Sequence, residues 1–166
     1  MKKLLSLALL LAGLAVARAD IANFTISLSG NQETPPNGSP GAGGGFASFD
    51  PVLQTISVNI VFGGLTSGLT AAHIHDGAMG VPGPIIVPLH PFLGMTAGSI
   101  AETDSASSLT AANITDLLAG HTYLNIHTTA FPGGEIRGQL VPVPEPSTLA
   151  LAGLGIAALA LRRRLV

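Results

Sequence analysis

Histidines are the residues of this chain best suited to chemistry, and two of the five, His73 and His75, stand one residue apart. Both imidazoles share one face of an expected strand, because strand side chains alternate with a period of two. His127 ends a later polar and apolar alternation over residues 121–127. Imidazole nitrogens suit Zn, Cu, Fe or Ni. The pattern therefore predicts a candidate metal site at His73, His75 and His127, with copper or zinc as the expected ion.

A second interpretation of the same pattern needs no ligand. The polar residues of 121–127, and Glu135 and Arg137 further on, fall on one side of strands whose other side is apolar. Such a face is typical of an antiparallel sheet with one side in water. The histidines would then only form hydrogen bonds, and Glu135 and Arg137 would form a surface or inter-strand pair. Both interpretations stay open, and His90 is expected in a loop.

Composition excludes several functions. There is no cysteine, so thiol chemistry, disulfides and cysteine metal sites are excluded. Six of the seven lysines and arginines lie near the two ends of the chain. Between residues 20 and 141 there are eight acidic residues and one basic residue, Arg137, so the net charge of this part is −7 with neutral histidines. Such a surface repels nucleic acid and acidic polysaccharide. No nucleophile-elbow or phosphate-loop motif is present, so the sequence does not favour an enzyme but leaves the question open.

Short strands must position these residues. Alternation of apolar and polar residues, bounded by turn residues, predicts eight short strands. An apolar stripe predicts one helix over residues 108–118, capped by Ser108 or Thr110. The Gly- and Pro-rich residues 30–45 are expected to be mostly loop. The pattern predicts an all-β fold, an antiparallel β-sandwich or barrel with one short helix. The expected strands cover residues 24–29, 45–49, 56–62, 71–75, 85–89, 100–103, 122–126 and 134–140.

Both ends of the chain carry apolar runs beside basic residues. Lys2 and Lys3 precede the apolar run 4–17, and Ala17-Arg18-Ala19 fits a small-x-small cleavage site, which predicts a secretory signal. The alternative is an N-terminal anchor helix, for which the run is short. The expected segments are a signal peptide at 1–19, a β domain at 20–141, a Pro-rich linker at 142–146, and a transmembrane helix with a basic tail at 147–166.

The C-terminal segment resembles a known sorting signal. Pro144-Glu145-Pro146 is followed by an apolar run and by Arg162, Arg163 and Arg164, the order found in the PEP-CTERM signals of Gram-negative bacteria. The resemblance implies processing by an exosortase, after signal peptidase has acted at the other end. It also implies that the C-terminal helix first holds the protein in the inner membrane, and that the protein then reaches the cell envelope or extracellular matrix. Such proteins typically accompany exopolysaccharide production.

The centre of the chain resembles a CHRD domain. The opening of that domain is matched by residues 24–30 and Glu33-Thr34-Pro35-Pro36, its middle by Ala72-His73-Ile74-His75, and its end by residues 123–128 and 132–140. CHRD domains occur in many bacterial exported proteins and are similar to modules of the BMP antagonist chordin. Their molecular activity is poorly defined, so the resemblance implies export more than chemistry.

A weaker similarity concerns the histidines. A His-x-His strand in a β-sandwich with a distant third His is similar to the copper site of Cu/Zn superoxide dismutase. It implies His73, His75 and His127 as ligands, Arg137 facing the site, and an Ig-like or superoxide-dismutase-like sandwich of Greek-key type. The disulfide is missing, and no bridging histidine, zinc-ligand set or dismutase loop can be placed, so dismutase activity is not expected.

The sequence leaves three functional hypotheses. The first is an exported, non-enzymatic envelope or matrix protein that an exosortase sorts. The second is a metal-binding or redox domain that uses Cu or Zn at the three histidines. The third is a surface adhesin that binds a protein partner through a sheet edge or loop. Only the second predicts that changing a histidine removes a bound metal.

Overall fold

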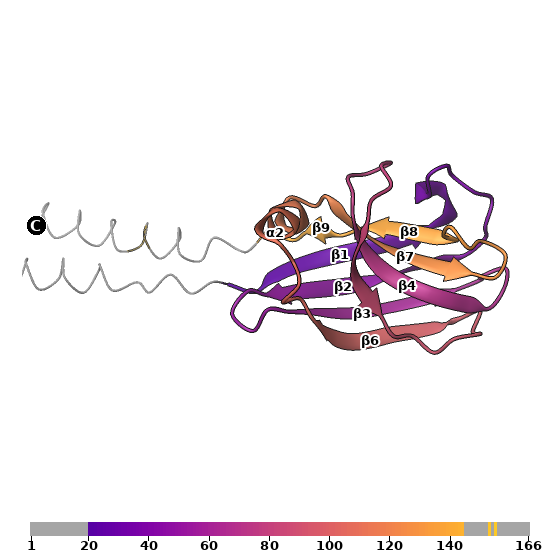
Figure 1. The fold of residues 1–166 in the computed structure, drawn as a ribbon, viewed down its shortest axis with the longest axis horizontal. Coiled ribbons are helices and arrows are strands. Elements are labelled where there is room, and N and C mark those ends of the chain that lie inside the picture. The colour runs from indigo at the N-terminus through magenta and orange to yellow at the C-terminus, as the bar shows by residue number, and fades with distance from the viewer. Residues whose placement is uncertain (1–19, 145–152, 154, 156–166) are drawn as a thin grey trace, which may run out of the picture.

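The computed structural model describes residues 20–144, 153 and 155. Residues 20–144 form one nine-stranded antiparallel sheet with one short α-helix (Figure 1), which confirms the predicted all-β class. The strand order is β5-β4-β7-β8-β1-β2-β3-β6, with β9 paired to β1. The elements are β1 (Ala22–Ser29), η1 (Gly30–Gln32), β2 (Ala42–Asp50), β3 (Thr55–Gly63), β4 (Leu69–Asp76), β5 (Ile85–Leu89), β6 (Gly98–Ser105), α2 (Ala111–Leu118), β7 (Thr122–Thr128), β8 (Ile136–Gln139) and β9 (Val141–Pro142).

Two four-stranded halves of this sheet enclose one apolar core, as in a β-sandwich. One half is β1, β2, β3 and β6, and the other is β5, β4, β7 and β8. Each strand turns alternate side chains inward, and each buried Leu, Ile, Val or Phe contributes roughly 1.5–3 kcal/mol. The largest fully buried side chains are Phe24, Leu28, Phe49, Ile56, Ile60, Leu69, Ile74, Leu117, Leu124, Ile126, Ile136 and Leu140.

The two halves are joined where β8 pairs with β1, and they nearly meet again where β5 lies close to β6. A Cβ at Gly138 would overlap the carbonyl oxygen of Ser27, so glycine is needed for this close backbone approach. At the far end, the backbone N–H of His90, just after β5, donates to a carboxylate oxygen of Glu102 in β6 at 2.8 Å. The strand path is therefore almost closed.

β2 differs from the prediction, because it begins at Ala42 and takes in glycines expected as loop. Gly43, Gly44 and Gly45 pair with both neighbouring strands. A Cβ at Gly45 would overlap the carbonyl oxygen of Asn59 in β3. These glycines serve close strand packing, which composition alone cannot distinguish from a turn.

α2 confirms the predicted helix, with a later start. Thr110 is the cap: its hydroxyl accepts from the N–H of Asn113, and the Asn113 side chain accepts from the N–H of Thr110. This reciprocal pair satisfies two backbone donors that the first helical turn leaves free. The capping pair therefore fixes where the helix begins, and the buried Leu117 anchors it to the core.

The predicted signal peptide lies outside the described residues, as does nearly all of the predicted transmembrane segment 147–166. Among the residues that the structure describes, no helix is long and apolar enough to cross a membrane. The start of the expected linker is ordered on the domain: the N–H of Val143 donates to the carbonyl of Asn23 at 2.8 Å.

Candidate metal centre

The three predicted histidines come together on the outer face of β4 and β7, away from the apolar core. β4 and β7 pair so that Ala71 lies opposite His127, which puts His127 diagonal to His73. Nδ1 of His73 lies 3.2 Å from Nε2 of His127. One nitrogen from each ring of His73, His75 and His127 lies within 4.8 Å of the others. The three rings are therefore close enough together for one ion to lie among them.

Two of the rings are oriented by backbone carbonyls. Nδ1 of His75 lies 3.0 Å from the carbonyl oxygen of Gly83, and Nδ1 of His127 lies 3.0 Å from that of Pro132. A carbonyl only accepts, so each Nδ1 carries the proton and each Nε2 keeps its lone pair. Nε2 of His75 is buried and has no hydrogen-bond partner among the described residues. Metal-binding histidines are commonly held in this way by their second nitrogen.

All three histidines are held in the neutral form. Burial, together with the neighbouring His127 and His75, lowers the pKa of His73 to about 4. Burial also lowers the pKa of His75, against the bond to Gly83 that raises it, and His127 and Arg137 add to the lowering. The pKa of His127 falls through burial, although its bond to Pro132 opposes the shift. Neutral imidazoles are the form that binds metals.

Tyr123 and Arg137 form a wall beside His75. The ring of Tyr123 stacks on His75 with centroids 4.8 Å apart and an interplanar angle of 8°. The guanidinium carbon of Arg137 lies 3.4 Å from the centroid of Tyr123. Arg137 thus lies near the histidines, but the Tyr123 ring stands between it and His75.

These strands fall within a known family. The family model of the CHRD domain matches residues 24–140, from β1 to the end of β8. This chain belongs to the CHRD domain family. The model of the PEP-CTERM protein-sorting motif matches residues 142–164. Comparisons with curated proteins and with solved structures gave no match.

The sorting motif implies how the CHRD domain reaches its location. PEP-CTERM motifs are processed by an exosortase, and the motif implies export to the cell envelope or extracellular space of a Gram-negative bacterium. The predicted sorting residues lie inside the match, and of these the structure describes only Pro144. They are Pro144, Glu145, Pro146, Arg162, Arg163 and Arg164.

The polar face around the histidines of the CHRD domain is covered, so the interpretation of this face as solvated was wrong. Residues 30–41 and 77–84 fold over the outer side of β4, β7 and β8 (Figure 1) and bond to it. Alternation along a strand shows which residues share a face, but not whether a distant loop covers that face. The buried polar residues are Glu33, His75, Thr122, Asn125, Thr128, Glu135, Arg137 and Gln139.

Side chains of this face hold the loop of residues 77–84 in place. The loop supplies the carbonyl of Gly83 that orients His75, so its position fixes the histidine as well. The bonds run from Arg137 to the carbonyls of Ala78 (2.9 Å) and Val81 (3.0 Å), from Gln139 to the carbonyl of Gly77 (2.9 Å), and from the N–H of Gly83 to the hydroxyl of Tyr123 (3.1 Å).

Glu135 and Arg137, predicted as a surface or inter-strand pair, are buried and bind separate partners. Glu135 accepts from the hydroxyls of Ser39 and Thr128, each at 2.6 Å, and from the N–H of Thr66 at 2.7 Å. Burial opposes the charge of Glu135, but these hydrogen bonds outweigh it and lower its pKa. Glu135 thus fixes the second covering loop through Ser39.

Glu33 is a buried acid to which the sequence assigned no role. Its Oε1 and the Oδ1 of Asn125 are buried without a hydrogen-bond partner in the described residues. Burial raises the pKa of Glu33 to about 7, although Arg137 and hydrogen bonds from Asn125 and the Thr34 backbone lower it. No local pattern could reveal Glu33, because its loop reaches the sheet only through tertiary contacts.

The other two histidines lie elsewhere. His90 is in a loop, as predicted, and is largely exposed. Its Nδ1 meets the carboxylates of Glu102 and Asp104, a grouping that the sequence did not indicate. His121 is exposed beside Asp116, with 3.4 Å between Nδ1 and Oδ1. Neither histidine belongs to the three-histidine group.

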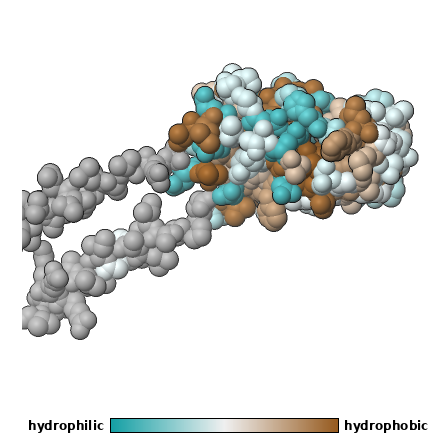
Figure 2. Space-filling view, turned by 90° about the horizontal axis from the view of Figure 1, so that it is seen from below, coloured by the Kyte–Doolittle hydropathy of each residue, from teal (hydrophilic) through white to brown (hydrophobic). Residues whose placement is uncertain are grey.

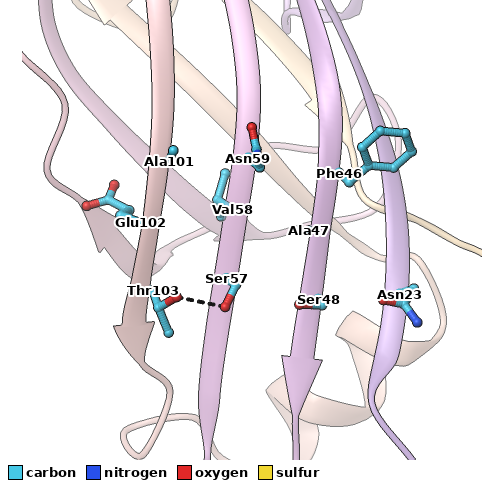
Figure 3. A pocket seen from close by; sticks show the side chains of 10 residues that line it. All are labelled: Asn23, Phe46, Ala47, Ser48, Ser57, Val58, Asn59, Ala101, Glu102 and Thr103. Carbon is cyan, nitrogen blue, oxygen red and sulfur yellow. Dashed lines mark hydrogen bonds between the residues drawn. The ribbon is translucent and has the colours of Figure 1, made fainter.

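A hollow of about 390 Å³ lies on the other half, over the outer face of β1, β2, β3 and β6. Figure 3 shows its side chains spread in rows across these strands, with small polar groups and Phe46 and, among titratable residues, Glu102. On the side of the domain seen in Figure 2, hydrophilic and apolar side chains are interspersed. The hollow gathers no cluster of reactive groups, so the histidines remain the candidate site.

Proposed function

We propose that this exported CHRD domain binds one transition-metal ion, copper or zinc, through His73, His75 and His127. The observation that carries the proposal is the convergence of three imidazoles from two strands, with donor nitrogens within 4.8 Å of one another. The carbonyls of Gly83 and Pro132 support it, because they place the protons of His75 and His127 on Nδ1 and leave each Nε2 unprotonated. Nε2 of His75 has no partner among the described residues, and Nε2 of His127 bonds Nδ1 of His73, a contact that an ion would replace. Three nitrogen ligands leave a fourth position for water or another small ligand.

The chemistry of the donors favours late first-row ions. Three neutral imidazoles bring no negative charge, and such sites suit Cu and Zn better than the oxygen-seeking Mg or Ca. The carbonyl of Gly83, in the loop 77–84, and that of Pro132, between β7 and β8, also fix the rings of His75 and His127 before any ion arrives, which reduces the entropy lost on binding. The exposed side of His73 leaves a path from solvent.

We infer that the domain works outside the inner membrane as a non-enzymatic envelope or matrix protein. Signal peptidase would remove residues 1–19, and the segment 147–166 would hold the chain in the membrane until the exosortase acts. Association with exopolysaccharide is part of this proposal, as is an unidentified matrix or protein partner. The sorting motif at residues 142–164 supports the route.

Metal content and titration with Cu(II) and Zn(II) test the proposal on the purified protein. We expect the wild-type protein to bind one equivalent at neutral pH. Binding should be weaker by about 100-fold or more in His75→Ala, because losing even a residue that only orients a metal ligand weakens binding about 10- to 100-fold. His121→Ala is the matched control, because this histidine is exposed and outside the group.

Failure of the folded protein to bind either ion would contradict the metal site. The three histidines would then belong to the buried hydrogen-bonding network alone. A protein partner captured equally well by wild type and by His75→Ala would in that case favour the matrix or adhesin hypothesis.

A further inference from the structure

A second group of side chains of the types that bind metals lies between β5 and β6, the first and last strands in the order of the sheet. His90, just after β5, places its Nδ1 3.4 Å from Oε2 of Glu102 and 3.3 Å from Oδ1 of Asp104, both on β6. One donor atom from each of the three lies within 4.8 Å of the others. Donors from separate segments therefore converge on one point.

The two carboxylates are held on the core-facing side of β6. Glu102 and Asp104 alternate in step with Ile100, which is buried in the core, and their side chains are only 19% and 16% exposed. Figure 3 shows Glu102 projecting from β6 on the side away from β3. Oδ2 of Asp104 is buried and has no hydrogen-bond partner among the described residues. The acids thus keep oxygens for a ligand that the protein does not supply.

In the part of the chain that the structure describes, no lysine or arginine balances the two carboxylates at the seam, the place where β5 and β6 come together. Arg137 is the single Lys or Arg between residues 20 and 144, and it is bound to the loop 77–84 on the other half of the sandwich. Two nearby carboxylates repel each other in a partly buried position unless a cation lies between them. Within the described domain, His90 is the one side chain of the seam that can carry positive charge.

We propose that His90, Glu102 and Asp104 bind a divalent cation of the Mn(II) class, separately from the three-histidine site. Two carboxylates and one imidazole form a harder, anionic donor set, which suits Mn(II) far better than three neutral imidazoles do. The ion would replace the missing cation and tie β5 to β6, so it would close the strand path. The three-histidine site lies on the outer face of β4 and β7, and either site can exist without the other.

Titration of the metal-free protein with Mn(II), followed by the loss of the EPR signal of the aqueous ion, tests this site. We expect one saturable equivalent in wild type, at least about tenfold weaker binding in Asp104→Asn, and a Mn(II)-dependent rise in Tm that the variant lacks. Asp116→Asn is the matched control, because Asp116 also pairs with a histidine but has no third donor beside it among the described residues.

Three results would overturn the proposal: no saturable Mn(II) binding by the folded wild type, equal binding by Asp104→Asn, or binding that disappears in His75→Ala instead. The last would assign the ion to the three-histidine site. If Asp104→Asn does not fold, His90→Ala gives the same test, because the side chain of His90 is 70% exposed and its removal leaves the core intact. Without a cation, the inward acids would serve only to prevent pairing of the β6 edge with other chains.

Discussion

The two halves of the sandwich carry similar alternation on their outer faces, yet those faces end in different environments. On β1, the outward Thr25 and Ser27 are exposed to water. On β7, the outward Tyr123 and Asn125 are only 3% and 4% exposed. The difference comes from the loops 30–41 and 77–84, which fold over β4, β7 and β8 and leave the other half open (Figure 1).

Covering a polar face changes what its residues can do. A buried polar group that loses its partner costs about 1–3 kcal/mol, so such a face is stable only while nearly every group is bonded. The bonds that satisfy it also fix the rings of His75 and His127. On the open half, water can satisfy the same kinds of group, and the bond between Ser57 and Thr103 is exposed to it. The side chains that are held in place before any ligand binds therefore lie in the covered half.

Gly83→Ala should give the largest effect, because it removes the cover. A Cβ at this position would overlap the carbonyl oxygen of Asp76, so the loop must move away from His75 and Tyr123. We expect a loss of about 3 kcal/mol or more in the free energy of unfolding, measured in urea, together with loss of Cu(II) or Zn(II) binding. Gly38→Ala, where a Cβ meets nothing within 4 Å, is the control. Equal stability of the two variants would show that the cover is dispensable.

Glu135→Gln should rank next, because it replaces a buried acceptor of three hydrogen bonds with a group that also donates. Bonds to charged groups contribute about 1.5–3 kcal/mol, so we expect a loss of roughly 2–3 kcal/mol in urea unfolding. Asp116→Asn on the exposed side of α2 should change stability by about 0.5 kcal/mol or less. Similar losses in both variants would contradict the distinction between covered and open acids.

Glu33→Gln should alter the pH dependence of stability. With a pKa of about 7 when folded, against 4.5 when free, Glu33 keeps a proton that the unfolded chain releases. The folded state then binds more protons at this group between these values, so the contribution of Glu33 to stability falls as pH rises from about 4.5 to 7. The variant should lack this fall, a difference on the order of 2 kcal/mol. Parallel stability profiles of the two proteins would show that Glu33 ionises normally.

Ser57→Ala on the open half should have the smallest effect. The hydroxyl of Ser57 bonds that of Thr103 at 2.8 Å on the exposed face of β3 and β6. Water can replace this bond, so we expect a change of about 0.5 kcal/mol or less in thermal unfolding. Thr128→Val, which removes a buried hydroxyl from Glu135, provides the contrast and should lose about 1–3 kcal/mol. A reversed order would contradict the comparison of the two halves.

Much of the fold was predictable from local pattern, and the exceptions share one cause. The strands around Phe24, Ile60 and Ile74 and the helix before Leu118 were found because alternation and capping act over a few residues. The glycines of β2 were misjudged, since close packing against β3 is a relation between strands. The face shared by His73 and His75 was predictable, but the burial of Arg137 and Glu135 was not.

The sequence by itself determined which residues alternate, that residues 20–141 carry almost no basic side chain, and that the C-terminal segment bears a sorting motif. Only the tertiary structure decided that β4 pairs with β7, which brings His127 to His73. It alone placed His90 against Glu102 and laid the two loops over one half of the sandwich. Strand periodicity is a property of neighbouring residues, whereas pairing and cover depend on how the whole chain closes around its core.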